Sequence, residues 1–267
     1  MRIATWNVNS IRQRIDHLAA WLKERAPDIV CLQETKTTDD AFPREPLEAL
    51  GYNLAIHGQK TFNGVAILSR LPFDEVTLRL PGDDGDDHAR FIEAVVSTAR
   101  GALRIACLYL PNGNPVGTEK YPYKIRWMDR LAAYASERLK LEEDFVMAGD
   151  YNVIPAPADV YDPQGWSEDA LFRLETREKF RALLNLGLTD AIRASSDQAG
   201  LYTFWDYQAG CWPKNNGLRI DHLLLSPRAA DRLQGTGIDK HVRSWEKPSD
   251  HVPVYVDLAI PRTASGA

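Results

Sequence analysis

The fold of this chain is decided near its C-terminus, by Ser249-Asp250-His251-Val252-Pro253 and the run Val254-Tyr255-Val256-Asp257-Leu258. Apolar and polar residues alternate in the second half of this stretch, which is the pattern of a β-strand with one buried face. A charged pair before such a strand is costly unless it contacts water, a metal ion or a partner charge. Taken alone, the pair also fits an ordinary turn that precedes a strand.

Three other apolar runs end in the same way. The polar residues that follow these runs are Asn7 and Asn9, then Glu34, then Asp150 and Asn152. Loops at strand ends carry much of the chemistry of enzymes, because a rigid sheet holds them in place. The alternative is that each acid or amide caps a turn, which Asp and Asn do readily. Four such breaks in one chain favour a shared site.

Periodicity places these breaks in a mixed fold. Short apolar or alternating runs predict strands, at residues 3–8, 29–32, 65–68, 91–96, 103–110, 145–148, 218–225 and 252–258. Helical spacing predicts helices from Ile11 to Pro27, with Ser10 as the N-cap, and over 123–139 and 171–186. No Gly/Ser-rich linker or repeat divides the chain. We expect one domain over residues 1–260, made of two packed sheets with helices outside, and a frayed tail over 261–267.

Composition indicates a soluble globular protein. The chain has 267 residues, of which 44% are hydrophobic and 26% charged. No apolar run approaches the length of a transmembrane helix, and the N-terminus turns polar too early for a signal peptide. We therefore expect a cytoplasmic protein without a membrane partner.

The cysteines and the net charge say less about function than the motifs do. Cys31 and Cys107 lie inside apolar runs, and with Cys211 they lack the spacing of a zinc site, which predicts reduced, structural thiols. The formal net charge is −5, so attraction to a polyanion would depend on a local basic face. Part of that charge is the acidic run 83–87, which we interpret as a solvated loop. Charge neither supports nor excludes nucleic acid as a partner.

The polar breaks hold residue types suited to phosphate chemistry. Glu34 and Asn7 offer hard oxygen ligands for Mg²⁺, which keeps several waters and borrows oxygens from a substrate phosphate. Asp150 could take a proton from water while Asn152 holds the water or a phosphate oxygen, and Gly149 permits the turn that this requires.

A histidine and a tyrosine complete the candidate set. His251 could donate hydrogen bonds to a phosphate if protonated, and a carboxylate partner such as Asp221 would favour that charged form. Tyr109, at the end of another strand, could place its hydroxyl on a phosphate, although a core tyrosine is the common alternative. The other histidines receive no role; they are His17, His57, His88, His222 and His241.

Six segments together match a known pattern in the expected order. They are Asn7-Val8-Asn9-Ser10-Ile11-Arg12, Leu32-Gln33-Glu34-Thr35-Lys36, Tyr109-Leu110-Pro111-Asn112, Gly149-Asp150-Tyr151-Asn152, Leu218-Arg219-Ile220-Asp221 and Ser249-Asp250-His251-Val252-Pro253. With them the chain resembles the exonuclease III family of apurinic/apyrimidinic endonucleases, within the endonuclease/exonuclease/phosphatase superfamily. The resemblance implies an α/β fold of the DNase I-like type, a four-layered α/β sandwich of two packed, mostly antiparallel sheets with helices outside.

The resemblance also implies roles for individual residues. Glu34 would be the principal metal ligand, assisted by Asn7, with Asp250 close to the metal. Asp150 would orient and deprotonate water, or protonate the leaving group in other mechanisms of the family. The residues implied to hold the scissile phosphate are Asn152, Tyr109, and His251 paired with Asp221. The cofactor would be Mg²⁺, or Mn²⁺ in its place.

On the substrate side, the resemblance implies a pocket for a flipped, baseless sugar. Its walls would be Phe204, Trp205, Leu218 and Ile220, although Phe204 and Trp205 also fit ordinary strand-core aromatics. Lys36, Arg90 and Asn112 match positions expected near the DNA backbone, where contacts position the duplex without reading sequence. Some relatives carry a bulkier aromatic where Leu218 stands, which leaves the balance of endonuclease and exonuclease activity open.

The expected activity is hydrolysis of duplex DNA on the 5′ side of abasic sites, with 3′→5′ exonuclease activity and trimming of blocked 3′ ends. The expected partner is duplex DNA with such lesions, bound by a monomer. A damage-insensitive nuclease is the main alternative, and a phosphatase acting on inositol phosphates or lipids is a second. A catalytically silent DNA-binding protein is a third.

Overall fold

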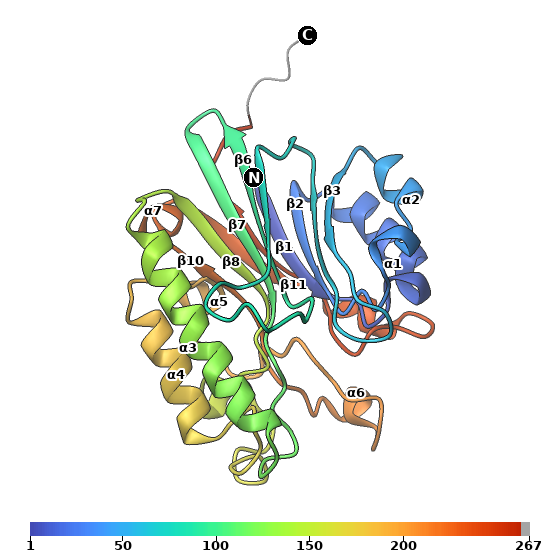
Figure 1. Cartoon of the computed structure of the whole chain (residues 1–267). Helices are drawn as coiled ribbons and strands as arrows, with labels where there is room; N and C mark the ends of the chain where they lie inside the picture. Colours follow the sequence, from blue (N-terminus) through green and yellow to red (C-terminus); the bar gives the residue numbers. More distant parts are fainter. Residues whose placement is uncertain (263–267) are drawn as a thin grey trace.

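Two six-stranded sheets pack face to face in this protein (Figure 1). The computed structural model describes residues 1–262. The first sheet contains, from edge to edge, β11 (Leu233–Ile238), β12 (Val254–Leu258), β1 (Arg2–Asn7), β2 (Ile29–Gln33), β4 (Val65–Ser69) and β3 (Asn53–His57). The second contains β5 (Glu75–Leu78), β6 (Phe91–Thr98), β7 (Gly101–Tyr109), β8 (Asp144–Asp150), β10 (Asp221–Leu225) and β9 (Thr189–Asp190).

Both sheets are mixed, with mostly antiparallel pairs. The parallel pairs are β1 with β2 and β7 with β8, and the other neighbouring strands run antiparallel. Parallel neighbours require a crossover connection, usually a helix. The helices α1 (Ile11–Arg25) and α3 (Lys120–Leu139) make these two crossovers.

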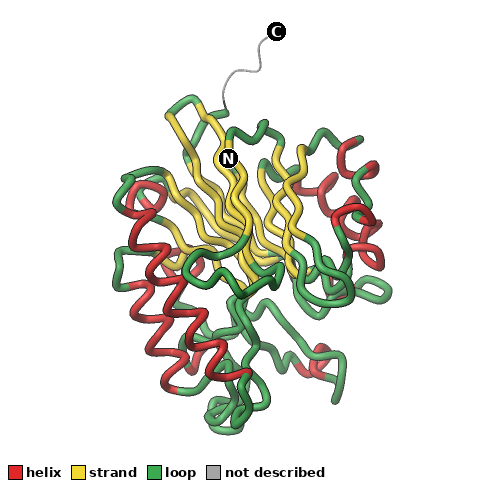
Figure 2. Tube along the Cα trace, in the orientation of Figure 1, coloured by secondary structure: helices red, strands yellow, loops and turns green. Residues whose placement is uncertain are grey.

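The helices cover the outer faces of the sheets (Figure 2). Together, α1 and α2 (Glu45–Glu48) lie on the first sheet, while α3 and α4 (Leu174–Leu184) lie on the second. Short helices occupy the connections, namely η1 (Asp39–Ala41), η2 (Pro157–Asp159), α5 (Ala191–Ser195), α6 (Cys211–Lys214), α7 (Pro227–Ala230) and η3 (Lys240–Ser244). The predicted four-layered α/β sandwich is confirmed.

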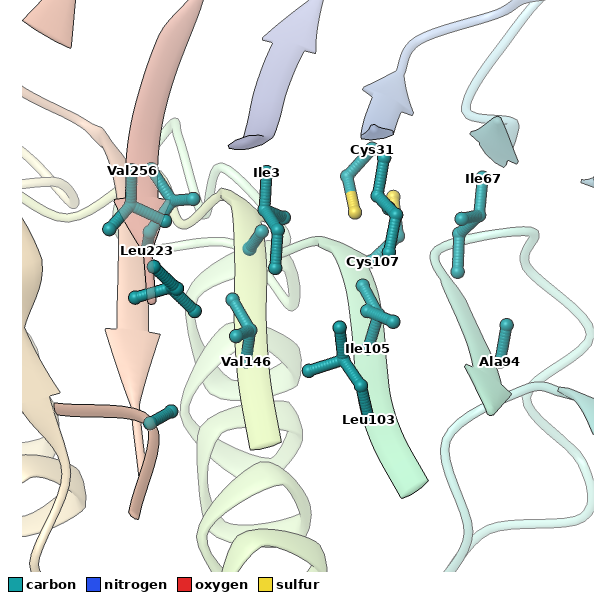
Figure 3. Packing of buried hydrophobic residues seen from close by; sticks show 14 of the residues in the cluster. Ile3, Cys31, Ile67, Ala94, Leu103, Ile105, Cys107, Val146, Leu223 and Val256 are labelled. Atoms are coloured by element: carbon teal, nitrogen blue, oxygen red, sulfur yellow. The ribbon is translucent and has the colours of Figure 1, made fainter. Parts of the chain in front are cut away.

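The main core lies between the two sheets. Ile3 and Val256 of the first sheet face Val146 and Leu223 of the second, all without exposed surface (Figure 3). Burying one such side chain contributes about 1.5–3 kcal/mol. Cys31 and Cys107 lie in the same layer as free thiols, and burial raises the pKa of Cys31 well above its usual value. Both side chains are packed in the core, as expected for structural cysteines.

The start of α1 differs from the prediction in its capping. Ser10 precedes the helix, but its φ is 89° and its side chain makes no capping hydrogen bond. The backbone that follows β2 takes over instead, because the Ser10 and Ile11 N–H groups donate to the carbonyls of Glu34 and Thr35, at 2.8 and 3.1 Å. These bonds tie the loops after β1 and β2 together.

Element boundaries differ most in the second half of the chain. The helix predicted over 171–186 is α4, at Leu174–Leu184. The strand predicted from Leu218 begins at Asp221 as β10, because residue 218 forms only isolated bridges, to Val160 and Phe204. Sequence periodicity missed β3, β5, β9 and β11. The strands β3, β5 and β11 lie at sheet edges, where burial leaves a weaker pattern in the sequence. The strand β9 has only two residues, too few to show a period.

The C-terminal end of the described chain returns to the first sheet. The Arg262 guanidinium contacts the Asp28 carboxylate, and residues 263–267 of the predicted tail lie outside the described residues. Among residues 1–262, no helix has both the length and the apolar composition needed to cross a bilayer.

Candidate active site

Strand ends from both sheets meet at one place. Asn7 ends β1, and its register partner Gln33 immediately precedes Glu34. In the second sheet, Asp150 at the end of β8 pairs with Tyr109 of β7 and with Asp221, the first residue of antiparallel β10. The topology therefore brings the C-terminal ends of four strands together with the N-terminal ends of β10 and β12.

A pocket of about 290 Å³ opens at this convergence. It is lined by the following residues that were expected from sequence: Glu34, Tyr109, Asn112, Asp150, Asn152, Phe204, Leu218, Ile220, Asp250 and His251. Asn7 and Asp221 lie directly behind the lining, hydrogen-bonded to it. Residues 34 and 251 are separated by most of the chain, so their approach is a consequence of the fold.

Asn7 joins the two carboxylates at the bottom of the pocket. Its Nδ2 donates to Glu34 Oε1 at 2.8 Å and to Asp150 Oδ2 at 3.0 Å, and the residue is fully buried. Its Oδ1, which was expected to assist a metal, accepts the Asn9 N–H at 3.0 Å. In this arrangement Asn7 acts as a hydrogen-bond donor that holds Glu34 and Asp150 beside each other.

Glu34 is kept ionised by its neighbours. The chain turns here through positive φ at both Glu34 (52°) and Lys36 (54°). Burial alone would raise the pKa of Glu34. Lys36, whose Nζ lies 2.7 Å from Glu34 Oε2, and the bond from Asn7 outweigh it, so the pKa is lowered. Lys36, expected near a DNA backbone, thus lies at the rim of the site.

Asp150 shows the opposite shift. Burial is the main cause that raises the pKa of Asp150 to about 7, with the carboxylates of Asp221 and Glu34 adding to it and the charge of His251 opposing it. A backbone bond from Asn152 N to Asp150 Oδ1, at 2.9 Å, fixes the carboxylate in the pocket. A carboxyl with this pKa exchanges protons readily near neutral pH.

His251 is held by Asp221 and not by its sequence neighbour. Its Nδ1 lies 2.9 Å from Asp221 Oδ2, and Thr203 Oγ1 donates to the same oxygen at 2.6 Å. Burial opposes the charged imidazole, but Asp221 and then Asp150 raise the pKa of His251 to about 10. His251 is therefore a cation whose Nε2 faces the pocket, 3.7 Å from Asp150 Oδ2.

Asp250 points to a different partner. Its Oδ1 accepts from Asn9 Nδ2 at 3.1 Å, so the two adjacent residues 250 and 251 serve different parts of the site. Between them and β1, Ser249 Oγ donates to the Asn7 carbonyl at 2.7 Å and accepts the His251 N–H at 3.2 Å. The serine thus fixes the loop that carries both residues.

A divalent metal ion fits this chemistry. Glu34, Asp150 and His251 each offer one ligand atom, and these atoms lie within 4.8 Å of one another. The oxygens of Glu34 and Asp150 are the kind of donor that a hard cation prefers. Asp250, expected near the metal, lines the pocket but lies outside this group.

Tyr109 provides a neutral donor. Burial, together with the negative charges of Glu34 and Asp150, raises the pKa of Tyr109 well above its usual value, so the hydroxyl keeps its proton. Arg90 packs over the Tyr109 ring at 4.8 Å and donates to the Tyr109 carbonyl at 3.2 Å. A second hollow of about 420 Å³ is lined by Arg90, Lys120 and Asn112, on the other side of Asn112.

The apolar wall of the pocket has only part of its predicted members. Phe204 and Leu218 bridge each other, and the Phe204 ring lies 4.9 Å from the His251 ring. Trp205, expected beside Phe204, does not line the pocket. It has no exposed surface and packs against Trp212, because neighbouring residues of an extended chain face opposite sides.

Five lining residues were missed by sequence reasoning: Asn114, Trp166, Asp169, Leu171 and Asp206. Asn114 Nδ2 donates to both oxygens of Asp169 at 3.1 Å, which closes one side of the pocket. None of these residues directly ends a predicted strand, so the pattern that marked the other site residues did not mark them. A tryptophan within the polar stretch 162–169 is the one signal that could have drawn attention there.

Known proteins share both this sequence pattern and this fold. The model of the endonuclease/exonuclease/phosphatase family matches residues 4–251. An exodeoxyribonuclease III of Haemophilus influenzae is 32% identical over 97% of this chain and all of its own length.

Two solved structures agree closely. A 3′ phosphatase from Neisseria bound to a product DNA hairpin has a TM-score of 0.93 and 38% identity, over 97% of this chain and 99% of its own. An AP endonuclease from Archaeoglobus fulgidus has a TM-score of 0.92 and 35% identity over the same shares. The chain thus belongs to the endonuclease/exonuclease/phosphatase family, and within it to the exonuclease III group.

Proposed function

We propose that this protein is a DNA repair nuclease that depends on a divalent metal and hydrolyses duplex DNA on the 5′ side of abasic sites. We infer 3′→5′ exonuclease activity and trimming of blocked 3′ ends as companion activities. The observation that carries the proposal is the convergence of Glu34, Asp150 and His251 on one pocket, with His251 Nε2 lying 3.7 Å from Asp150 Oδ2. Membership of the exonuclease III group supports the choice of DNA as substrate.

The proposed chemistry assigns one task to each group. Asp150 accepts a proton from the attacking water, whose oxygen forms the new P–O bond. The bond from phosphorus to the 3′ oxygen breaks, and that oxygen takes a proton from solvent water to leave as a 3′-hydroxyl. His251 and Tyr109 donate hydrogen bonds to the phosphate oxygens as their charge increases, and one such preorganised donor is worth ~10²–10³ in rate. Asn152 orients the water or the phosphate.

The metal is proposed to be Mg²⁺, with Mn²⁺ as a substitute. Glu34 would be its principal ligand, and Asn7 keeps the Glu34 carboxylate beside that of Asp150. The bound ion supplies positive charge to the phosphate and to the leaving oxygen. The fit rests on the hard oxygens and on their excess negative charge, which a divalent cation neutralises.

The substrate pocket favours a nucleotide without a base. Phe204, Leu218 and Ile220 form an apolar wall beside the charged groups, and Phe204 contacts His251 directly. Turning a nucleotide out of the stack costs least where no base is paired, which favours a damaged site. Lys36, Arg90 and Asn112 lie around the rim, where they would contact the DNA backbone.

The test uses a duplex that contains a single tetrahydrofuran abasic analogue. With Mg²⁺ the wild-type protein should cut this strand at the analogue, and EDTA should abolish the cut. An undamaged duplex and a duplex with a 3′ phosphate serve as parallel substrates. Equal internal cutting of the undamaged duplex would favour the damage-insensitive nuclease, and hydrolysis of an inositol phosphate without DNA incision would favour the phosphatase.

We further propose that the protein acts as a monomer in the cytoplasm and that residues 1–260 form one folding unit. The pocket is complete within one chain, which supports a monomer. Sedimentation at micromolar concentration should give the mass of a single chain. A single cooperative transition in thermal unfolding should accompany it.

A further inference from the structure

A lysine lies beneath the pocket, although nothing in the mechanism uses it. Lys124 belongs to α3, on the outer side of the second sheet, and has no exposed surface. Its Nζ donates to the Asn112 carbonyl at 3.0 Å and to the Asn152 carbonyl at 2.5 Å. One ammonium group therefore joins two loops that line the site.

These loops leave neighbouring parallel strands. Asn112 follows β7 and Asn152 follows β8, beyond the last register pair of the two strands, Tyr109 with Asp150. The side chains also meet, since Asn112 Nδ2 donates to Asn152 Oδ1 at 3.1 Å. Asn152 has a φ of 47°, a conformation that needs support from its surroundings. Without Lys124, both carbonyls would lose a buried donor.

Burying an ammonium group is costly, and the contacts of the Lys124 ammonium group indicate what offsets this cost. Burial lowers the pKa of Lys124 to about 7. A methionine or leucine would fill the same space on an amphipathic helix without that cost. The polar contacts of Lys124 are backbone carbonyls of pocket residues, so its benefit is the placement of those loops.

The loop around Lys124 is shaped to admit it. Gly113 has a φ of +90°, and a Cβ at this position would lie 2.7 Å from Lys124 Cδ and 3.1 Å from Ala170 Cβ. The backbone thus passes directly over the lysine stem, in a conformation that glycine adopts easily. Any movement of the stem would be transmitted to Asn112 on one side and Asn114 on the other.

We propose that Lys124 is a positioning residue for hydrolysis, which holds the loops of Asn112 and Asn152 at a fixed distance and so keeps both amides in the lining of the pocket. The inference rests on the proposed nuclease function. It assigns to a helix on the outer layer a part in the geometry of the site, through contacts that leave the reacting atoms untouched.

The variant Lys124→Met tests this role, because it keeps the length of the side chain and removes the donor. On the tetrahydrofuran duplex we expect kcat to fall about 10- to 100-fold, since small displacements of positioning groups cost rates of this order. The KM should change much less than kcat, because Lys36 and Arg90, two of the three residues proposed to contact the DNA backbone, are unchanged.

Arg104→Met is the matched control. Arg104 is nearly as buried and is paired with Glu93 at 2.9 Å and Glu143 at 2.8 Å, near the opposite end of β7. The Arg104→Met variant should have a lower melting temperature than the wild type and an unchanged kcat below that temperature. If Lys124→Met loses activity only in proportion to its folded fraction, as the control should, Lys124 is merely structural and the proposal fails.

A double-mutant cycle with Asn152→Ala separates placement from other effects. If Lys124 acts through Asn152, adding Lys124→Met to Asn152→Ala should cost much less in kcat than it costs in the wild-type background. Full additivity would overturn the proposal. Lys124→Gln replaces Lys124→Met in the cycle if the methionine variant does not fold.

The wild-type protein is measured first in this series. Absence of incision by the wild type would reject the proposed function itself. Incision by the wild type together with an unchanged kcat in Lys124→Met would reject only the role of Lys124.

Discussion

Two of the buried clusters of charged side chains in this protein are built in opposite ways. The pocket cluster consists of Glu34, Asp150, Asp221 and His251. The Arg219 cluster, which lies beneath the Leu218–Ile220 wall, consists of Asp159, Asp190, Arg193 and Arg219. The first has three acids against one histidine, and the second has two acids against two arginines.

The Arg219 cluster satisfies itself. Arg219 Nε lies 2.7 Å from Asp159 Oδ1, and its Nη1 lies 2.7 Å from Asp190 Oδ2. Burial would raise the pKa of Asp159, but Arg219 and Arg193 outweigh it, so that pKa is lowered. The pKa of Arg219 is raised despite its burial. Each charged group here has a partner of opposite charge within the chain.

The pocket cluster does not satisfy itself. Burial raises the pKa of Asp150 to about 7, which means that its ionised form lacks sufficient compensation within the protein. A divalent cation beside Glu34 and Asp150 would supply that compensation. The comparison teaches that the opposite pKa shifts of Asp150 and Asp159, two buried carboxyls, separate an acid that needs a further partner from an acid that stabilises the fold.

The largest expected effect comes from Asp150→Asn. The variant keeps the shape of the side chain and removes the proton acceptor, so turnover on the tetrahydrofuran duplex should fall about 10³-fold or more. Burial disfavours the ionised form of the wild-type Asp150 carboxylate. Without metal, the melting temperature of the variant should therefore equal or exceed that of the wild type. Steady-state incision assays and thermal unfolding in EDTA measure the two effects. A fully active Asp150→Asn protein would contradict the role of Asp150 as the proton acceptor.

The second effect concerns the other cluster. Arg219→Met leaves Asp159 and Asp190 buried without their main partner, which should lower the free energy of unfolding by about 3–5 kcal/mol. Urea denaturation measures the loss. Arg2→Met is the control, because its pair with Asp257 at 2.8 Å is partly exposed and should contribute about 1 kcal/mol or less. Equal losses in the two variants would contradict the view that the Arg219 cluster is built for stability.

The third effect separates the two acids around His251. Since Asp221 raises the pKa of His251 to about 10, Asp221→Asn should lower that pKa more than Asp250→Asn does. Lowering it makes the histidine lose its proton at lower pH, so the alkaline limb of the pH–rate profile should move to lower pH. The rate at pH 8 should fall about 10- to 100-fold in Asp221→Asn.

NMR titration of the His251 ring, followed for the two variants, measures this shift directly. A larger change in Asp250→Asn would mean that the sequence neighbour, and not the partner across the sheet, holds the charge. The geometry argues against that outcome, because Asp250 Oδ1 accepts from Asn9 and not from the His251 ring.

Sequence patterns marked the residues that the structure brings together in the pocket cluster, but they did not reveal the Arg219 cluster. Glu34, Asp150 and His251 each follow or precede an apolar run, so the end of a buried strand marked them as candidates. Periodicity alone does not show that these residues lie together, because that depends on the order of the strands in the sheets. The resemblance to a known family implied a shared site, and the strand order explains it. The arrangement of two inner sheets and outer helices was also predicted from sequence. Strand and helix periods are strong where one face of the element is buried.

The Arg219 cluster had no such mark. Asp159 lies in the short turn η2 and Arg193 in the five-residue helix α5, where too few residues exist to show a period. Lys124 was hidden for a related reason, since a lysine in an amphipathic helix is expected on the solvent face. Edge strands such as β5, with all four residues exposed, were missed because no face of them is buried.

The smallest expected effect contrasts the two buried histidines. Burial, with Arg219 adding to it, lowers the pKa of His222 to about 4, whereas that of His251 is raised. His222 Nε2 donates to the Val153 carbonyl at 2.9 Å, and its Nδ1 faces Arg219 Nη1 at 3.1 Å, so a second proton would meet a guanidinium. Between pH 6.5 and 4 the unfolded chain therefore binds a proton that the folded chain excludes.

In that window the free energy of unfolding should fall as the pH falls, and His222 contributes at most about 1.4 kcal/mol per pH unit to the slope. His222→Leu should reduce the slope between pH 6.5 and 4, as measured by urea denaturation at several pH values. Phe180→Leu is the control, because Phe180 packs 5.0 Å from the His222 ring and carries no proton. It should lower stability at every pH without changing the slope. An unchanged slope in His222→Leu would show that the Arg219 cluster tolerates a third positive charge, and that its balance is looser than its distances indicate.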